Sequence, residues 1–485
     1  MQFSSYLFML VFLPVVVTIY YLLNRVNIKT GKTFLILMSV GFYFCTGIKC
    51  VIVLAISMAL NYFISQMVKG KAERGVIGSN KWLIVGIAAN IVILAFFKYC
   101  NFFADTIGSW LGESIVAEVA LPMGISFYTF QQIMYLVSVY RGEMNYSVDD
   151  YLFYILYFPK LIMGPITNPV ELVTASNDVK RKKVDFDNIV LGIQLFVCGL
   201  FKKVIIADTL AGAVSWGQKN LTTATAIDLA IIVLSYTLQI YFDFSGYSDM
   251  AVGVSKMLNI ELPINFDLPY QACSVSDFWK RWHMSLTNFL TRYVYIPLGG
   301  NRKGLVRTCI NIMIVFLISG IWHGSSFNFI MWGGIYGVLM VLERLLSKWL
   351  DRIPNLIRWV FVLGMVNILW VFFWTDSVSD ATYVMGRILS FEGMNVSSEL
   401  MQCFCLKEFT FISDIAGLAF ITNHLWGLSM WGFLALSLAI CLFIKNIYKW
   451  KIKRTAGTLV FTLIAFTYCL LSIATQTAGF IYSGF

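Results

Sequence analysis

The sequence has few charged residues and very few histidines. Of its 485 residues, only 13% are Asp, Glu, Lys or Arg, and three are His. Soluble chains carry about 25% charged residues, whereas 59% of this chain is hydrophobic and its mean hydropathy is +0.75. This composition excludes an ordinary soluble globular protein and is typical of an integral membrane protein. We expect one membrane domain over residues 1–485, without a soluble domain or a long linker.

The beginning of the sequence lacks the features of a signal peptide. No Lys or Arg precedes the first apolar run, and no small-residue cleavage site follows it. The first basic residues, Arg25, Lys29 and Lys32, come after the run. We therefore expect an uncleaved first helix in the cell membrane with its N-terminus outside.

The net charge of +10 does not indicate nucleic-acid binding. The basic residues gather in short segments between apolar runs, as in 69–81, 180–183 and 449–454. Cytoplasmic loops of membrane proteins show this bias. Acidic segments around 105–118 and 392–414 then fall outside, and the lipid bilayer, not nucleic acid, is the expected partner.

Apolar runs of the length that spans a bilayer recur along the chain, which predicts an all-α polytopic bundle of about 11 transmembrane helices. The candidate spans are 6–24, 33–47, 51–68, 82–99, 119–139, 189–206, 226–250, 308–322, 327–346, 357–374, 429–448 and 457–478. The segment 151–168 contains Pro159, Gly164 and Pro165, which favours re-entrant, broken helices over a span. Lys202 and Lys203 fall at the end of their helix that this topology places outside, away from the other basic residues. Only snorkelling of the side chains or a bent helix would explain this position.

Two histidines lie in segments with unusual patterns. In 277–296, Trp and other apolar residues recur at helical spacing, which predicts one amphipathic helix at the cytoplasmic interface with His283 on its apolar side. The run after Arg307 reaches His323 and then returns to basic residues, which predicts a hairpin. At 1.5 Å per residue, His323 lies roughly 22 Å along its first arm, and Gly320, Gly324, Ser325 and Ser326 allow the turn.

A histidine is the side chain that exchanges a proton near neutral pH, and an ionisable group at membrane depth indicates function. The alternatives are structural: His323 bridges helices, and His283 is an interfacial anchor. Gln239, Asp243, Ser245 and Asp249 are further polar residues in an apolar context. They either line a polar path, pair with basic residues or form hydrogen bonds between helices. No G-x-S-x-G, P-loop or H-E-x-x-H motif occurs, and we expect no metal site and no bound cofactor.

Several motifs give the chain a resemblance to membrane-bound O-acyltransferases, and most of all to the membrane subunit of alginate and related polysaccharide O-acetylation systems. The matching runs are LPMGISFYTFQQIMYLVSVYRG at 121–142, YFPKLIMGPI at 157–166, LQIYFDFSGYSDMA at 238–251, DFWKRWHMSLTNFLTRYVYIPLGGNRKG at 277–304, SGIWHGSSFNFIMWGGIYG at 319–337, WVFFWTDS at 370–377 and the terminal FIYSGF. The block 277–337 is the most specific. YIPLGGNR favours polysaccharide acetylation over the related D-alanyl teichoic acid branch.

The resemblance implies a helical bundle with a central tunnel, in which the family's invariant histidine maps to His323 and its second histidine to His283. It also implies a cytosolic acyl thioester donor (acetyl-CoA or an acyl carrier), a polysaccharide acceptor outside, and an extracytoplasmic SGNH-type esterase or transferase partner. Relatives often have Arg-Asp where this chain has Thr291 and Arg292, so any role of that acidic position is not carried over.

The mechanism expected from these residues is acyl transfer with His323 as general base and His283 as an orienting or charge-stabilising group. Trp279, Trp282 and Trp322 would line the tunnel with Gln239, Asp243 and Ser326. The donor's phosphates would meet Lys280, Arg281, Arg302, Lys303 and Arg307, which are otherwise positive-inside anchors. A transporter of acyl groups, with the chemistry done by the partner, is the rival hypothesis; it predicts inverted repeats, and none is found. A scaffold for a polymer-export complex would explain neither histidine.

Overall fold

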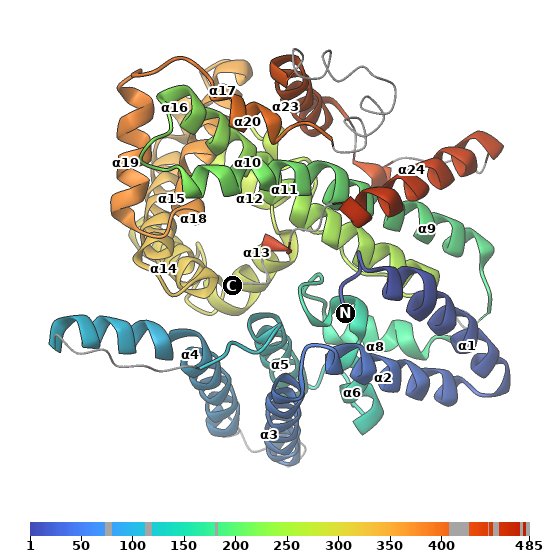
Figure 1. Ribbon diagram of the computed structural model, residues 1–485. Helices are drawn as coiled ribbons and strands as arrows, with labels where there is room; N and C mark the ends of the chain where they lie inside the picture. The colour runs from blue at the N-terminus through green and yellow to red at the C-terminus, as the bar shows by residue number, and fades with distance from the viewer. Residues whose placement is uncertain are drawn as a thin grey trace. The chain divides into compact units, whose positions relative to one another are not determined.

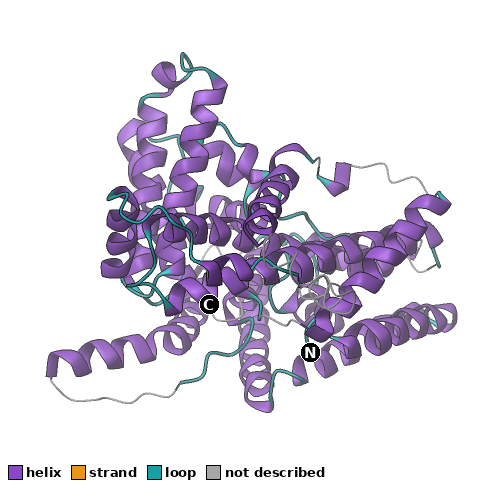
Figure 2. Ribbon diagram, turned by 45° about the horizontal axis from the view of Figure 1, so that its top comes forward, coloured by secondary structure: helices purple, strands orange, loops and turns teal. Residues whose placement is uncertain are grey.

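The computed structural model describes residues 1–72, 80–111, 119–179, 183–406, 426–444, 446–449, 455–475 and 479–481. Within these ranges every regular element is a helix and no strand is present (Figure 2). The expected basic runs at 180–182 and 451–454 lie outside the described residues, as do the acidic stretches at 112–118 and 407–425. The all-helical prediction is confirmed for the part of the chain that the structure describes.

Nine helices in the described ranges are long and apolar enough to cross a membrane. They are Phe8–Val26, Ile48–Lys69, Lys81–Gly108, Phe186–Lys219, Ala226–Met257, Leu305–His323, Asn355–Trp374, Trp426–Phe443 and Ala456–Ala474. Three further predicted spans form α2 (Ile28–Phe44), α5 (Ile125–Tyr140) and α15 (Phe327–Leu345), which are not among the nine. Helices α2 and α5 have 17 and 16 residues, fewer than the roughly 20 that a bilayer core needs. The chain is thus a multi-span membrane protein.

The chain divides into two compact units that alternate along the sequence, so the prediction of a single domain stays a prediction. The first unit comprises Met1–Phe196 and Tyr247–Ile264. Most of its helices are labelled in Figure 1. They are η1 (Phe8–Phe12), α1 (Leu13–Val26), α2 (Ile28–Phe44), α3 (Ile48–Ala72), α4 (Asn80–Leu111), α5 (Ile125–Tyr140), α6 (Val148–Leu156), α7 (Phe158–Leu161), α8 (Pro169–Asn177), most of α9 (Phe186–Phe201) and the end of α11 (Ala226–Met257).

The expected break in the helix over 151–168 is confirmed. Three short helices, α6, α7 and α8, stand where a single span would otherwise be. The start of α6 is fixed by a capping box, in which Ser147 and Asp150 each bond the other's backbone N–H. Pro159 and Pro169 stand in the first turns of α7 and α8, where a missing N–H costs nothing.

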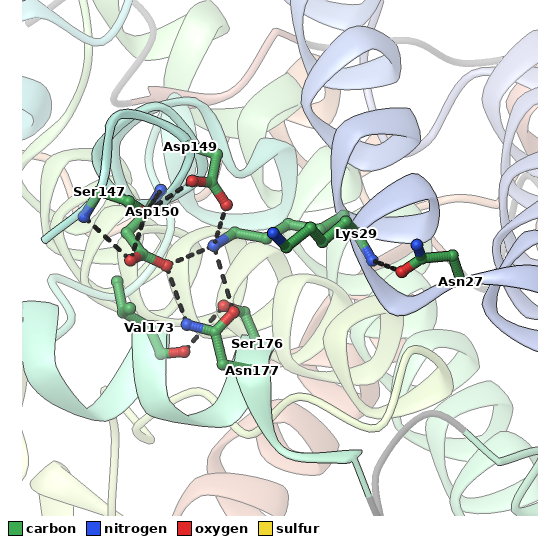
Figure 3. A network of polar contacts seen from close by, with 9 residues as sticks. Asn27, Lys29, Ser147, Asp149, Asp150, Val173, Ser176 and Asn177 are labelled. Atoms are coloured by element: carbon green, nitrogen blue, oxygen red, sulfur yellow. Dashed lines mark hydrogen bonds and ion pairs between the residues drawn. The ribbon is translucent and has the colours of Figure 1, made fainter.

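A buried lysine links α2 to this broken segment. The ammonium of Lys32 contacts Asp150 and lies 3.0 Å from a carboxylate oxygen of Asp149 and 3.2 Å from the amide oxygen of Asn177. The side chains of Asp149, Asp150 and Asn177 converge on that point (Figure 3). Burial alone would raise the pKa of Asp150, but hydrogen bonds from Lys32, Ser147 and Asn177 outweigh it and hold the pKa below its ordinary value.

The second unit comprises Val197–Gly246 and Asn265–Phe485. Beyond the end of α9 and the first part of α11, its described helices are η3 (Lys202–Ala207), α10 (Asp208–Lys219), η4 (Pro269–Gln271), α12 (Val275–Arg281), α13 (Met284–Leu290), η5 (Thr291–Tyr295), α14 (Leu305–His323), α15 (Phe327–Leu345), α16 (Ser347–Leu350), α17 (Asn355–Leu369), α18 (Val371–Trp374), α19 (Val378–Leu389), α20 (Ser398–Gln402), α23 (Trp426–Phe443), η6 (Ile447–Lys449) and α24 (Ala456–Thr475).

The hairpin predicted around His323 is formed by α14 and α15, which lie side by side (Figure 1). Glycines allow the two backbones to touch. A Cβ atom on Gly320 would lie 2.3 Å from the carbonyl oxygen of Phe329, and one on Gly333 would lie 2.4 Å from that of Phe316. Both distances are below van der Waals contact, so this approach requires glycine on both helices.

We predict that Gly333→Ala destabilises the protein by about 1–3 kcal/mol because the added methyl forces the two helices apart. Gly334 offers a matched control, since a Cβ there would meet only Leu317 at 3.9 Å. Gly334→Ala should be neutral or slightly stabilising, because alanine is the better helix former. Thermal unfolding of both variants in nanodiscs tests this, and equal melting temperatures for the two would contradict it.

Candidate active site

His323 is the last residue of α14, directly before the turn that leads into α15. Its side chain is 3% exposed, and three aromatic rings surround it. The ring centroids lie 4.8 Å away for Trp322, 5.3 Å for Trp332 and 5.1 Å for Phe373. The site of His323 is therefore buried and lined by aromatic rings.

Phe373 reaches His323 because the loop after α18 is tied to the start of α15. The amide of Asn328 donates a 2.7 Å hydrogen bond to the carbonyl oxygen of Thr375. Asn328 itself is 1% exposed. No signal in the sequence indicated Asn328 or Phe373, because the contacts of Asn328 with Thr375 and of Phe373 with His323 join segments separated by α16 and α17.

His283 is fully buried, but the prediction of one helix over 277–296 is wrong. The segment forms α12 and α13, with His283 between them in the left-handed region at φ 43° and ψ 52°. Such a conformation costs a non-glycine residue of the order of 1–2 kcal/mol. After Leu290 the chain continues as the π-helical turn η5. The residues of the predicted periodic pattern are helical, but they are divided between two short helices, α12 and α13.

Asn265 holds the break between α12 and α13. Its carbonyl oxygen accepts a 2.9 Å hydrogen bond from the backbone N–H of Met284, and its side-chain oxygen accepts one of 3.1 Å from Ser285. These bonds satisfy two of the orphan donors at the start of α13. Asn265 is thus the partner that offsets the strained backbone at His283.

Glu343, near the end of α15, holds the other end of α12. One carboxylate oxygen accepts hydrogen bonds from the backbone N–H groups of Val275 (2.6 Å) and Ser276 (3.3 Å). Its second oxygen bonds the Ser276 hydroxyl. A carboxylate at a helix N-terminus also interacts favourably with the helix dipole. This contact ties α12, which carries Trp279 and leads to His283, to the hairpin that carries His323.

A continuous set of aromatic rings joins the two histidines. Trp322 stands between them, with its ring 4.8 Å from that of His323 and 6.2 Å from that of His283. Phe244 of α11 meets His283 edge-on at 4.8 Å. Trp279 lies 5.6 Å from Trp332. The structure therefore brings together both predicted histidines and the three predicted tryptophans, since Trp282 joins the set through Trp370 at 5.0 Å.

Some polar atoms of these rings are buried without a partner. The indole nitrogens of Trp279 and Trp332 and the hydroxyl of Tyr336 have no hydrogen-bond partner among the described residues. Tyr336 lies 5.0 Å from Trp279 and 5.1 Å from Trp332, ring to ring. A buried donor left unpaired costs about 1–3 kcal/mol. Such donors remain for a ligand that enters the site.

The other predicted site residues are polar side chains on α11 and at the start of α15. Asp243 is buried on α11 in an ion pair with Lys203, and Ser326 is half-buried at the start of α15. The side-chain oxygen of Gln239 is buried without a hydrogen-bond partner in the described ranges. Their roles in lining a tunnel stay predictions.

Most of the predicted donor-binding cations have exposed side chains. Lys280, Arg302, Lys303 and Arg307 are exposed. Arg281 is half-buried and pairs with Asp277 at 2.8 Å, one turn earlier on α12. That pair reduces the capacity of Arg281 for phosphate, so the exposed four are the better candidates.

Burial determines the protonation state of His283. Burial lowers its pKa to about 3, from an ordinary value of 6.5. The side chain is therefore neutral at physiological pH, and one ring nitrogen carries a lone pair while the other carries a proton. It can orient a carbonyl or a hydroxyl, but it does not supply a fixed positive charge.

We predict that His283 makes the protein lose stability as the pH falls below about 6.5. Between pH 6.5 and about 3 the unfolded chain binds a proton at this residue and the folded protein does not, so unfolding becomes easier as pH decreases. His283→Gln should flatten the dependence of melting temperature on pH between 7 and 4.5. Asp150, whose pKa lies below 3.8, titrates outside that window. Parallel profiles for wild type and variant would refute the prediction.

Glu343→Ala should lower the free energy of unfolding by about 0.5–2 kcal/mol, as for the loss of a helix cap. The backbone donors of Val275 and Ser276 then lose their acceptor. Thermal unfolding in nanodiscs measures the effect. Glu261→Ala is the control, because it removes a carboxylate that is 69% exposed and, among the described residues, pairs with Lys256 at 3.2 Å. A loss of stability no larger than in the control would count against the cap.

Comparison with known proteins identifies the family of the chain. The family model for MBOAT, the membrane-bound O-acyltransferase family, matches residues 33–378, which include both histidines. The chain is similar to the peptidoglycan O-acetyltransferase of Helicobacter pylori, with 35% identity over 427 residues and 81% of each chain covered.

It is also similar to a probable alginate O-acetylase of Pseudomonas putida, with 36% identity over 409 residues and 82% of each chain covered. A teichoic acid D-alanyltransferase of Bacillus subtilis is 27% identical over 256 residues, which is 50% of this chain and 65% of that one. The family match, the relatives and the helical architecture agree. The chain belongs to the membrane-bound O-acyltransferase family and is an O-acyltransferase.

Proposed function

We propose that this protein moves an acetyl group, or another small acyl group, from a cytosolic thioester to hydroxyl groups of a polysaccharide outside the cell membrane. The observation that carries the proposal is the buried position of His323 at the end of α14, enclosed by Trp322, Trp332 and Phe373. The names of the most similar relatives, peptidoglycan O-acetyltransferase and alginate O-acetylase, support a polysaccharide acceptor.

In the proposed step, a ring nitrogen of His323 accepts the proton of the acceptor hydroxyl while the oxygen of that hydroxyl attacks the thioester carbonyl. The C–O bond of the ester forms, the C–S bond breaks, and the sulfur leaves as a thiolate that takes up the proton. General base catalysis of this kind contributes about 10²–10⁴-fold in rate. His283, neutral and held by Asn265 and Phe244, would orient the thioester or the developing oxyanion.

The aromatic enclosure has two uses in this mechanism. It excludes water, which limits hydrolysis of the thioester. Its unpaired donors, on Trp279, Trp332 and Tyr336, would bind the polar groups of the substrates or the oxyanion of the tetrahedral intermediate. The donor, acetyl-CoA or an acyl carrier, would approach from the cytoplasm along Lys280, Arg302, Lys303 and Arg307, and reach the acceptor by the tunnel that the family resemblance implies.

The cell membrane, with the N-terminus outside, is the proposed location. An extracytoplasmic SGNH-type partner would complete acylation of the polymer. The similarity to a teichoic acid D-alanyltransferase over half of the chain keeps D-alanyl transfer as a second candidate. A protein that only transports acyl groups is the third, and the histidine variants distinguish it.

We expect His323→Ala to lower transfer at least 100-fold, since it removes the base, and His283→Ala to lower it less. The assay follows radiolabelled acetyl from acetyl-CoA to alginate or peptidoglycan oligosaccharides, with the purified protein in nanodiscs and an SGNH-type acetyltransferase added. Radiolabelled D-alanyl thioester in place of acetyl-CoA tests the second candidate.

His424 lies outside the described residues and outside the 33–378 family match. His424→Ala therefore serves as the matched control and should keep wild-type transfer. Wild-type transfer by a folded His323→Ala protein would reject the general-base role and favour the transporter.

A further inference from the structure

A buried lysine in a membrane-spanning helix has no role in the mechanism above. Lys203 lies on the π-helical turn η3 and its side chain is 2% exposed. Its ammonium nitrogen is 2.9 Å from a carboxylate oxygen of Asp208 and 2.6 Å from one of Asp243. One cation thus faces two carboxylates. A buried ion pair is stable only if the remaining donors and lone pairs are satisfied as well.

The short segment Gly479–Ile481 supplies those missing contacts. The carbonyl oxygen of Gly479 accepts a hydrogen bond of 3.1 Å from the ammonium of Lys203, and the ring of Phe480 lies under the same nitrogen at 4.3 Å. The backbone N–H of Ile481 donates a 2.8 Å hydrogen bond to the second oxygen of Asp243. Three consecutive residues therefore supply further contacts to the ammonium of Lys203 and to the carboxylate of Asp243.

The number of donors explains why the segment is needed. An ammonium group has three N–H donors. That of Lys203 forms ion pairs with Asp208 and Asp243 and donates a hydrogen bond to the carbonyl oxygen of Gly479. Without the segment, a buried N–H of a charged group and a carboxylate oxygen would each lose a partner. The ion cluster and the docked segment therefore stabilise one another, and Phe480 is correspondingly only 4% exposed.

The docked segment lies on the helix that packs on the active site. Asp243 is followed on α11 by Phe244, whose ring meets that of His283 edge-on at 4.8 Å. Tyr241, on the preceding turn, lies 6.3 Å from Trp282. A shift of this part of α11 would therefore move two of the rings that enclose His283 and its neighbouring tryptophan.

We propose that Lys203, Asp208 and Asp243 form a docking cluster for the segment Gly479–Ile481, and that docking fixes α11 against His283 in the conformation that transfers the acyl group. These are positioning residues, since none of them contacts either histidine ring in the described contacts. The link to catalysis rests on the proposed function, whereas the docking itself does not.

Phe480→Leu tests the docking, because leucine keeps an apolar side chain but lacks the ring face that interacts with Lys203. Hydrogen exchange of the full-length protein in nanodiscs should show amides of Gly479–Ile481 exchanging about tenfold faster than in wild type, for loss of a buried cation–π contact. Phe480→Tyr, which keeps the ring, should restore slow exchange. Unchanged exchange in Phe480→Leu, with normal melting, would overturn the docking.

The transfer assay tests the positioning. Phe480→Leu should lower kcat several-fold with KM for acetyl-CoA unchanged, and Phe480→Tyr should recover it. The double variant Lys203→Met with Asp243→Asn, which removes one charge of each sign, should behave like Phe480→Leu in both measurements. Asp228→Asn is the matched control, because Asp228 is a buried aspartate of the same helix that instead bonds Ser397; it should leave exchange in Gly479–Ile481 and kcat unchanged.

Faster exchange with an unchanged kcat would overturn the positioning role and leave the acyltransferase proposal intact. If the wild-type protein transfers no acyl group, the proposed function fails, and the exchange measurement alone decides the docking. A pH profile of kcat that shifts in the double variant, but not in Phe480→Leu, would show that the cluster carries protons and would overturn a purely positional role.

Discussion

The close contact of α14 with α15 is the constraint on which the active site depends. His323 ends α14, and the two helices touch where Gly320 and Gly333 lack side chains. In a membrane, helices gain little from hydrophobic association and depend on close packing of this kind. The same contact sets the position of Trp332, the residue directly before Gly333, and of Glu343, which lies further along α15. One packing contact therefore positions His323, its aromatic enclosure and the cap of α12.

The position of His283 depends on a different kind of constraint, a strained backbone with long-range partners. Its left-handed conformation would be unfavourable in isolation. Asn265 compensates for it with two hydrogen bonds, and Glu343 fixes the helix that precedes it. The strained backbone at His283 places its imidazole against Phe244 and Trp322. A regular helix over the same residues would direct the side chain elsewhere.

The sequence predicted the parts of this protein that follow from local patterns. Apolar runs predicted the spans, glycines and serines around His323 predicted the hairpin, and prolines predicted the break over 151–168. The break at His283 could not be predicted, because it is imposed by Asn265, 18 residues earlier, and the segment's own periodicity is helical. Lys203 looked misplaced on its helix for the same reason: its partners, Asp208, Asp243 and Gly479, are separated in sequence by up to 276 residues.

Charged and neutral polar groups are buried in different ways in this protein, and the difference follows from their energies. Leaving a buried ion without its partner costs about 3–5 kcal/mol, and Lys203 has a carboxylate or carbonyl oxygen for each of its three donors. An unpaired neutral donor costs about 1–3 kcal/mol, which the fold can sustain at Trp279, Trp332 and Tyr336. Only neutral groups can therefore stay available for a substrate that is present for part of the catalytic cycle. Permanent charges must find their partners within the chain, which is why the ion cluster binds a segment of the protein itself.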